Sequence, residues 1–330
     1  MTAEKSAATT AKPALPVSNY SSPASLPAEG DECMQGRRIF GAVLAVVLLA
    51  GFATAKAQQG LPPNQHRIYV AVSDAKAAQA APRNIESFHV WENGVVRPVV
   101  AAAPATEIPA IIVIIHGFER DETLDARKAL TAFVDAVRAK SPDAKLAIIG
   151  DVQDPKLTNI TANAAKLDET ARRFSVSGSN LLYFEAIVDA SKALGKEPTD
   201  RRIIVTLTKS TKHDADHQTT PQTIAALKKS GAAVWSIDVT PENATQVVNN
   251  HATLEMDAFV QNAASYSGGA AERIFGTASL PSVLNRFADL ILGQYQITFE
   301  RPDFKGETEL RVGVAGVASE KVYGPGWFIR

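Results

Sequence analysis

Four short runs rich in apolar residues, separated by segments of helical character, constrain the fold of this sequence most strongly. They cover residues 110–115, 145–150, 202–208 and 232–238. The first of them is continuous and apolar throughout, which is typical of a strand that is buried on both faces of a parallel sheet, and the others are expected to be further central strands. Because strands alternate with helices, we predict a doubly wound α/β domain at residues 109–293, with a mostly parallel central sheet and helices on both faces.

The segments between these runs carry apolar side chains at helical spacing. After the first run, one stripe of a helix is formed by Leu130, Phe133, Val134 and Val137. Positions i, i+3, i+4 and i+7 share one helix face, so this stripe is expected to cover the sheet. A later helix is expected to have Thr220 as its N-cap, Pro221 at its first position and Gly231 at its end.

Short β segments are expected on both sides of this domain. The first covers residues 64–108 and includes a hairpin at residues 88–100. Asn93 and Gly94 suit the positive φ angles of a type I′ turn in that hairpin. The second segment covers residues 294–330 and contains further strand patterns.

Composition excludes several classes of function. The 330 residues carry 34 Lys and Arg against 35 Asp and Glu, a net charge of −1, whereas nucleic-acid recognition needs clustered cations. The single cysteine rules out a disulfide framework, cysteine-based zinc fingers and iron–sulfur ligation. No glycine-rich phosphate-binding motif follows a predicted strand, and no cofactor is expected.

The N-terminal part of the chain has the order of an export signal. Residues 1–33 are polar and rich in Ala, Pro, Ser and Thr, which predicts a disordered leader. Within residues 34–57, two arginines precede an apolar stretch at residues 39–55, and Ala57 ends an Ala-x-Ala cleavage pattern. The exported form is therefore expected to begin at Gln58.

Two alternatives stay open for this part of the chain. If translation begins at Met34, residues 1–33 are not part of the protein. If the signal is not cleaved, residues 39–55 form a signal anchor, whose 17 residues are at the lower limit for spanning a bilayer. In either case the globular part is expected outside the cytoplasm, as a periplasmic or secreted protein or on a membrane anchor.

Six short segments of the chain are each similar to a stretch of one protein family. They are VAVSD at 70–74, FHVWENG at 88–94, LYFEAI at 182–187, RRIIVTLT at 201–208, QYQITF at 294–299 and VYGPGWF at 322–328. In this order and spacing they resemble the von Willebrand factor type A domain, and more closely its exported bacterial subgroup called VWFA-related. The resemblance covers the chain from about residue 66 to residue 330.

This resemblance implies a metal-ion-dependent adhesion site at the C-terminal edge of the sheet. In the family, an Asp-x-Ser-x-Ser loop follows the first strand, a Thr precedes the third helix and an Asp follows the fourth strand. These hard oxygen ligands suit Mg²⁺. In this chain the corresponding residues are His116, Phe118 and Arg120 in the loop, Ser179 or Asn180 before the helix, and Lys209 after the strand.

Side chains of these types cannot replace anionic oxygen ligands. Neither a cationic side chain nor a phenyl ring offers Mg²⁺ an anionic oxygen, and two basic side chains would repel the ion. We therefore expect the metal site to be degenerate and to hold no ion. We further expect Lys209 to occupy the vacated charge site and to pair with Glu119.

Two catalytic readings compete with this interpretation. His213 and His217 are spaced as in zinc proteases, but their polar neighbours predict a solvated loop. The turn at His116 also resembles the oxyanion-hole turn of α/β-hydrolases. The nearest serine elbow, at Ser267, lacks its first glycine, and no histidine follows it because the last one is His251.

The sequence thus predicts an exported, non-enzymatic, adhesion-like interaction module that works without metal. Its partner is expected to be a protein, of unknown identity, and not a nucleic acid. The residues expected to form the binding site share the C-terminal edge of the sheet: His116, Phe118, Glu119, Arg120, Ser179, Asn180 and Lys209. The alternatives are an α/β-hydrolase-like enzyme and a purely structural protein of the cell envelope.

Overall fold

The computed structural model describes residues 61–73, 83–150, 158–175, 182–209, 219–240, 251–302 and 307–328. Contacts divide the chain into two units, Met1–Gln59 and Gly60–Arg330, and the first unit lies wholly outside the described residues. The predicted leader, the apolar stretch and the cleavage site at Ala57 and Gln58 are therefore outside them too. Of the helices in the described ranges, none has the length and apolar character needed to cross a membrane.

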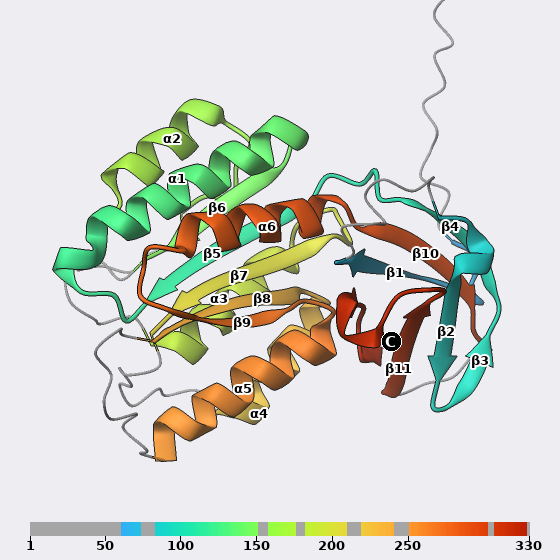
Figure 1. Ribbon diagram of the computed structural model, residues 1–330. Helices are drawn as coiled ribbons and strands as arrows, with labels where there is room; N and C mark the ends of the chain where they lie inside the picture. The colour runs from blue at the N-terminus through green and yellow to red at the C-terminus, as the bar shows by residue number, and fades with distance from the viewer. Residues whose placement is uncertain are drawn as a thin grey trace, which may run out of the picture. The chain divides into compact units, whose positions relative to one another are not determined.

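A five-stranded parallel sheet forms the centre of the second unit (Figure 1). Its order is β6-β5-β7-β8-β9. The strands are β5 (Ala110–His116), β6 (Lys145–Ile149), β7 (Arg202–Thr208), β8 (Ala233–Thr240) and β9 (Ala271–Phe275). All seven side chains of β5 are buried, as its uninterrupted apolar run requires. The predicted doubly wound fold is confirmed.

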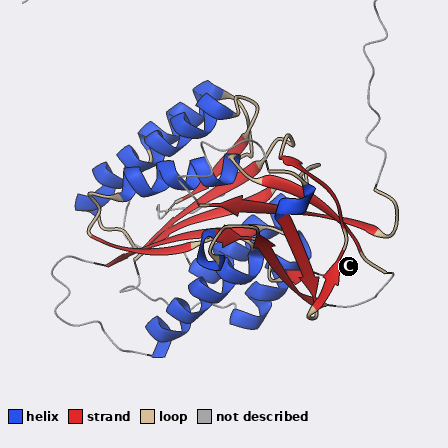
Figure 2. Cartoon of the chain, turned by 45° about the vertical axis from the view of Figure 1, so that its right-hand side comes forward, coloured by secondary structure: helices blue, strands red, loops and turns tan. Residues whose placement is uncertain are grey.

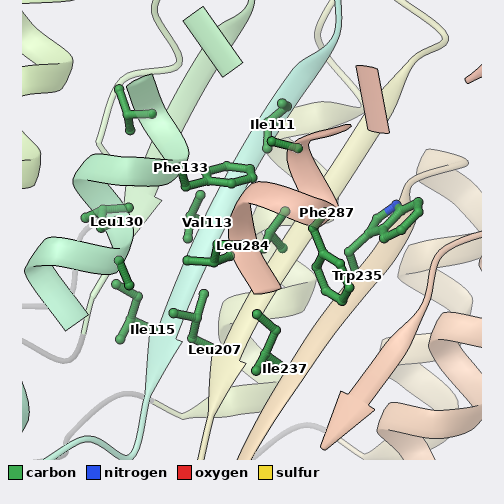
Figure 3. Packing of buried hydrophobic residues seen from close by; sticks show 14 of the residues in the cluster. Ile111, Val113, Ile115, Leu130, Phe133, Leu207, Trp235, Ile237, Leu284 and Phe287 are labelled. Carbon is green, nitrogen blue, oxygen red and sulfur yellow. The ribbon is translucent and has the colours of Figure 1, made fainter. Parts of the chain in front are cut away.

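Within the described residues, six α-helices cover the two faces of this sheet (Figure 2). On one face lie α1 (Thr123–Lys140), α2 (Ala164–Arg173) and α6 (Leu280–Leu292), and on the other α3 (Tyr183–Leu194), α4 (Thr220–Ser230) and α5 (His251–Ser267). Figure 3 shows how Leu130 and Phe133 of α1 and Leu284 and Phe287 of α6 pack on the apolar side chains of the strands. The predicted stripe of α1 thus faces the sheet.

The start of α4 differs by one residue from the prediction. Its N-cap is Thr219, whose side chain accepts a hydrogen bond from the backbone of Gln222, while the Gln222 side chain accepts one from the Thr219 backbone. Thr220 is already the first helical residue. The reciprocal bonds of this capping box favour the earlier position, since they satisfy two otherwise unpaired amide groups. Gly231 ends the helix at φ +68°, as expected.

Both flanking segments contribute strands to two four-stranded sheets, β12-β1-β10-β4 and β13-β11-β2-β3. The N-terminal strands are β1 (Gln65–Val72), β2 (Phe88–Glu92), β3 (Val95–Arg97) and β4 (Val99–Pro104). The C-terminal ones are β10 (Tyr295–Glu300), β11 (Thr308–Val314), β12 (Val322–Tyr323) and β13 (Trp327–Phe328). Apolar residues of both sheets form one buried cluster, so we call this part the β-sandwich. Asn93 and Gly94 have φ +48° and +78°, which confirms the predicted turn.

Candidate functional site

The winding of the parallel sheet reverses at β5. The next strand along the chain, β6, pairs with one side of β5, and β7 pairs with the other side. In doubly wound folds, ligands bind outside the carboxyl ends of the strands at such a reversal. His116 ends β5 and lies in register with Thr208, the last residue of β7, which Lys209 follows. The structure therefore brings His116 and Lys209 to the place where this fold class binds ligands.

His116 is held inside the protein rather than on its surface. Its side chain is buried, and Nδ1 lies 3.1 Å from the hydroxyl oxygen of Thr208. Its ring lies 5.4 Å, centroid to centroid, from the ring of Tyr183 at the start of α3. His116 thus joins β5 to β7 and α3, and a partner at the surface would reach it only indirectly.

Phe118 is a correction to the predicted site. Its side chain has no exposed surface and belongs to the same buried cluster as Leu130 and Phe133. Gly117, at φ +78°, allows the sharp change of direction that returns the chain to the core. The Phe118 ring is therefore a core side chain and offers no contact surface to a partner.

Lys209 has a carboxylate partner, but it is not the predicted one. Its ammonium lies 2.9 Å from each carboxylate oxygen of Glu122, and its side chain is only 8% exposed. The predicted partner, Glu119, instead caps the short 3₁₀ turn at Arg120–Glu122. The Glu119 backbone amide donates to Glu122 at 2.9 Å, so the Glu122 carboxylate joins this turn to Lys209.

The pairing with Glu122 had a signal in the sequence. Glu119 and Glu122 have the three-residue spacing of a capping box, which turns the second side chain back toward the first residue. That geometry carries the Glu122 carboxylate toward the end of β7. Glu119 and Arg120 are exposed beside it, whereas Ser179 and Asn180 lie outside the described residues.

A second ion pair joins β8 to β9 and was not predicted. Asp238 is 3% exposed, and its carboxylate accepts a hydrogen bond from Arg273 Nε at 2.7 Å. Arg273 also reaches Asp257 of α5, with Nη2 2.9 Å from Oδ2. The hydrogen bond with Asp238 raises the pKa of the Arg273 guanidinium. Here, too, a cation neutralises carboxylates, although the Arg273 side chain is 46% exposed.

Within the part of the chain that the structure describes, no three His, Cys, Asp or Glu side chains are grouped so that they could hold a metal ion. His213 and His217, the pair with zinc-like spacing, lie outside that part. What the described residues place at this edge is a pair of salt bridges, around Lys209 and Arg273, beside an exposed turn.

No protein-family model matches the chain, and no curated protein matches it. A solved von Willebrand factor type A protein from Catenulispora acidiphila is similar over 82% of this chain and 75% of its own, at 13% identity and a TM-score of 0.43. BatB, a conserved hypothetical protein from Bacteroides thetaiotaomicron, is similar over 56% and 98%, at 13% identity and a TM-score of 0.40. An aerotolerance-related membrane protein from Bacteroides fragilis is similar over 56% and 99%, at 14% identity and a TM-score of 0.36. At these identities the similarity concerns the fold alone.

Proposed function

We propose that this chain is an exported, non-enzymatic protein-interaction module that binds its partner at the C-terminal edge of the parallel sheet without a metal ion. The observation that carries the proposal is the Lys209 ammonium, 2.9 Å from both carboxylate oxygens of Glu122 at the reversal of the sheet. The Glu122 carboxylate, which could otherwise be a ligand of a metal ion, is already paired with the Lys209 ammonium.

Electrostatics support the metal-independent reading. Mg²⁺ requires hard anionic oxygens, and here it would have to displace an ammonium that is almost fully buried. Repulsion between the two cations at ligand distance is unfavourable even after solvent screening. The His116 ring, bonded to Thr208, adds no anionic ligand.

The exposed turn beside this pair is the surface that we assign to the partner. It consists of Glu119, Arg120 and Leu124, and the Leu124 side chain is 56% exposed although it is large and apolar. An apolar contact surrounded by charged groups is the usual composition of a protein interface. We call these three residues the edge turn. His116 and Phe118 position it from below.

The geometry around Ser267 supports a function without hydrolysis. Its hydroxyl accepts a hydrogen bond from the backbone amide of Val234 at 2.8 Å, near the start of β8. His116 lies at the end of β5, at the opposite edge of the parallel sheet. The serine elbow and the histidine of the α/β-hydrolase reading are thus separated by the length of the strands.

The proposal that the protein is exported rests on the signal pattern in residues 34–57.

A capture experiment with glutamate substitutions and a matched control variant tests the proposal. The immobilised protein should retain a specific protein from envelope extract equally well with Mg²⁺ and with EDTA. Arg120→Glu and Leu124→Glu should lose this protein, whereas Lys229→Glu, an exposed charge reversal at the C-terminal end of α4, should keep it. Release by EDTA would contradict metal independence. Equal loss in all three variants would place the binding surface elsewhere, and retention of nothing would favour a purely structural protein.

A further inference from the structure

A cavity of about 260 Å³ lies at the amino-terminal edge of the parallel sheet, opposite the edge turn. The starts of β7 and β8 and the C-terminal end of α4 form one side of it. Arg67 and Tyr69 of β1, Gln294 before β10 and Trp327 of β13 form the other side. Its volume falls just below the roughly 300–1,000 Å³ that is common for drug-sized ligands, so it suits a small molecule.

The wall of this cavity is strongly basic. Among the described residues that line it, four are cationic, namely Arg67, Arg201, Arg202 and Lys228, and the acidic one is the exposed Asp200. Arg67 pairs with Glu107 and Lys228 with Glu307, two carboxylates that are not part of the wall. The charges of Arg201 and Arg202 are compensated differently.

These two neighbouring arginines are held by uncharged oxygens. Arg201 donates from Nη1 to the backbone oxygen of Glu107 at 3.0 Å and from Nε to the amide oxygen of Gln294 at 3.2 Å. Arg202 donates from Nη1 to the backbone oxygen of Ser230 at 2.8 Å. In the described part of the chain, no carboxylate is hydrogen-bonded to either guanidinium. Backbone and amide oxygens orient both groups. The Glu107 carboxylate, which pairs with Arg67, also stabilises the charge of Arg201, although it is not hydrogen-bonded to it.

Burial makes a cation without a hydrogen-bonded carboxylate costly. Arg201 is 4% exposed, and its removal from water lowers the pKa of its guanidinium, although the nearby Glu107 carboxylate acts in the opposite direction. The buried Nε atoms of Arg67 and Arg202 have no hydrogen-bond partner in the described part of the chain. A buried cation gains stability when an anion with good geometry approaches it.

Trp327 adds a flat apolar surface beside these charges. Its ring stacks on Tyr266 with centroids 5.5 Å apart and planes 7° apart. The Lys228 ammonium lies 5.1 Å from the centroid of the Trp327 ring, within the range of a cation–π contact. Lys228 therefore connects the apolar wall of the cavity with its basic wall.

We propose that this cavity binds a small organic anion that carries a carboxylate or a phosphate group. Its charged group faces Arg201, Arg202 and Lys228, and its carbon skeleton lies against Trp327. The site is independent of the proposed partner surface, because it lies at the other edge of the sheet. It is formed jointly by the α/β domain and the β-sandwich.

Calorimetric titration of the purified protein with citrate and with inorganic phosphate, at constant ionic strength, tests this proposal. If only citrate binds saturably, the ligand class is carboxylates. If only phosphate binds saturably, the ligand class is phosphates. Lys228→Gln should weaken binding at least about fivefold, since it removes a lining charge. Lys229→Gln removes the same charge from the adjacent exposed position, which is not part of the wall, and should leave the affinity unchanged. Absence of saturable binding for both anions, or equal weakening by both variants, would overturn the proposal.

Fluorescence provides a second readout that leaves the charges intact. Saturation with the anion should change the tryptophan emission of the wild-type protein and of Trp91→Phe. In Trp327→Phe this change should disappear, because Trp327 is the tryptophan of the wall. A change that persists in Trp327→Phe would place the anion elsewhere and overturn the assignment.

Discussion

Lys209 and Glu122 lie 87 positions apart in the sequence, and the pairing of β5 with β7 brings them together. The ammonium is nearly buried, while the Glu122 side chain keeps 23% of its surface exposed. A buried charge that loses its partner costs much more than the intact pair contributes. Each member of this pair therefore constrains the other.

This leads to a prediction for the pair. Lys209→Met and Glu122→Gln should each lower the free energy of unfolding by about 1–3 kcal/mol, because each leaves an unmatched polar group behind. The double variant should lose clearly less than the sum, with a coupling energy of about 1 kcal/mol or more. Urea unfolding of the four proteins measures this. Additivity within about 0.5 kcal/mol would show that the pair contributes nothing as a pair.

Gly117 gives a second prediction at this scale. An added Cβ at Gly117 would lie 3.1 Å from the backbone oxygen of Lys209, and the residue has φ +78°. Gly94 has the same φ but nothing within 4 Å of such a Cβ, so Gly94→Ala isolates the conformational cost, about 1 kcal/mol. Gly117→Ala should lower the free energy of unfolding by about 2–3 kcal/mol, since the close contact adds to that cost. Equal losses in chemical unfolding would mean that the turn can relax away from Lys209.

At the scale of single elements, α4 shows how a cap decides where a helix begins. Thr219 and Thr220 are both suitable N-cap residues, and Pro221 is compatible with either choice. The position of Gln222 distinguishes them, because a capping box needs its second member three residues after the cap. The helix accordingly begins one residue earlier than predicted.

The two threonines allow a matched test of this cap. Thr219→Ala should lower the free energy of unfolding by about 1 kcal/mol, since it leaves the Gln222 amide without its acceptor. Thr220→Ala, inside the first turn, should change it by no more than about 0.5 kcal/mol. Thermal or urea unfolding of both variants decides between them. A larger loss for Thr220→Ala would contradict the observed cap.

Within the parallel sheet, β9 is the strand that the sequence pattern did not reveal. Its five residues, Ala271–Phe275, include only one buried apolar side chain, Ile274. An edge strand has a single neighbour and partial exposure, so it needs no continuous apolar run. Phe275, 71% exposed at its end, shows how weakly burial constrains this strand.

At the scale of the whole second unit, the β-sandwich joins segments from both sides of the α/β domain. Gln65 of β1 pairs with Glu300 of β10, and a buried ion pair joins Glu92 to Arg301. Arg201, just before β7, adds hydrogen bonds to the backbone oxygen of Glu107 and the side-chain oxygen of Gln294. Strand pairing between such distant segments requires the α/β domain to bring their ends together.

The prediction on export concerns the whole chain. Because the apolar stretch is followed by an Ala-x-Ala pattern, the mature protein should begin at Gln58. N-terminal sequencing of the protein isolated from the cell envelope measures this. An intact N-terminus at Met1 or Met34, found in the membrane fraction, would instead indicate an uncleaved signal anchor.

Much of the fold could be predicted because the faces of strands and helices that are buried carry apolar residues at regular spacing in the sequence. The apolar runs of β5 and β7 and the stripe of α1 each reflect contact with a core on known faces. The Asn93-Gly94 turn is equally local, since its φ angles suit only a few residue types. His116 and Lys209 could be assigned to one edge because parallel strands end there together.

What the sequence by itself determined is therefore the kind of each central element and the edge at which the candidate site lies. The tertiary structure alone decided that Phe118 points into the core, that Lys209 pairs with Glu122, and that four cationic side chains meet at the opposite edge. The physical reason is that the periodicity of apolar residues indicates which side chains of an element face the core, but not which residues they contact there. Ion pairs and cavities depend on the relative positions of distant segments, which form only when the sheet and the β-sandwich are assembled.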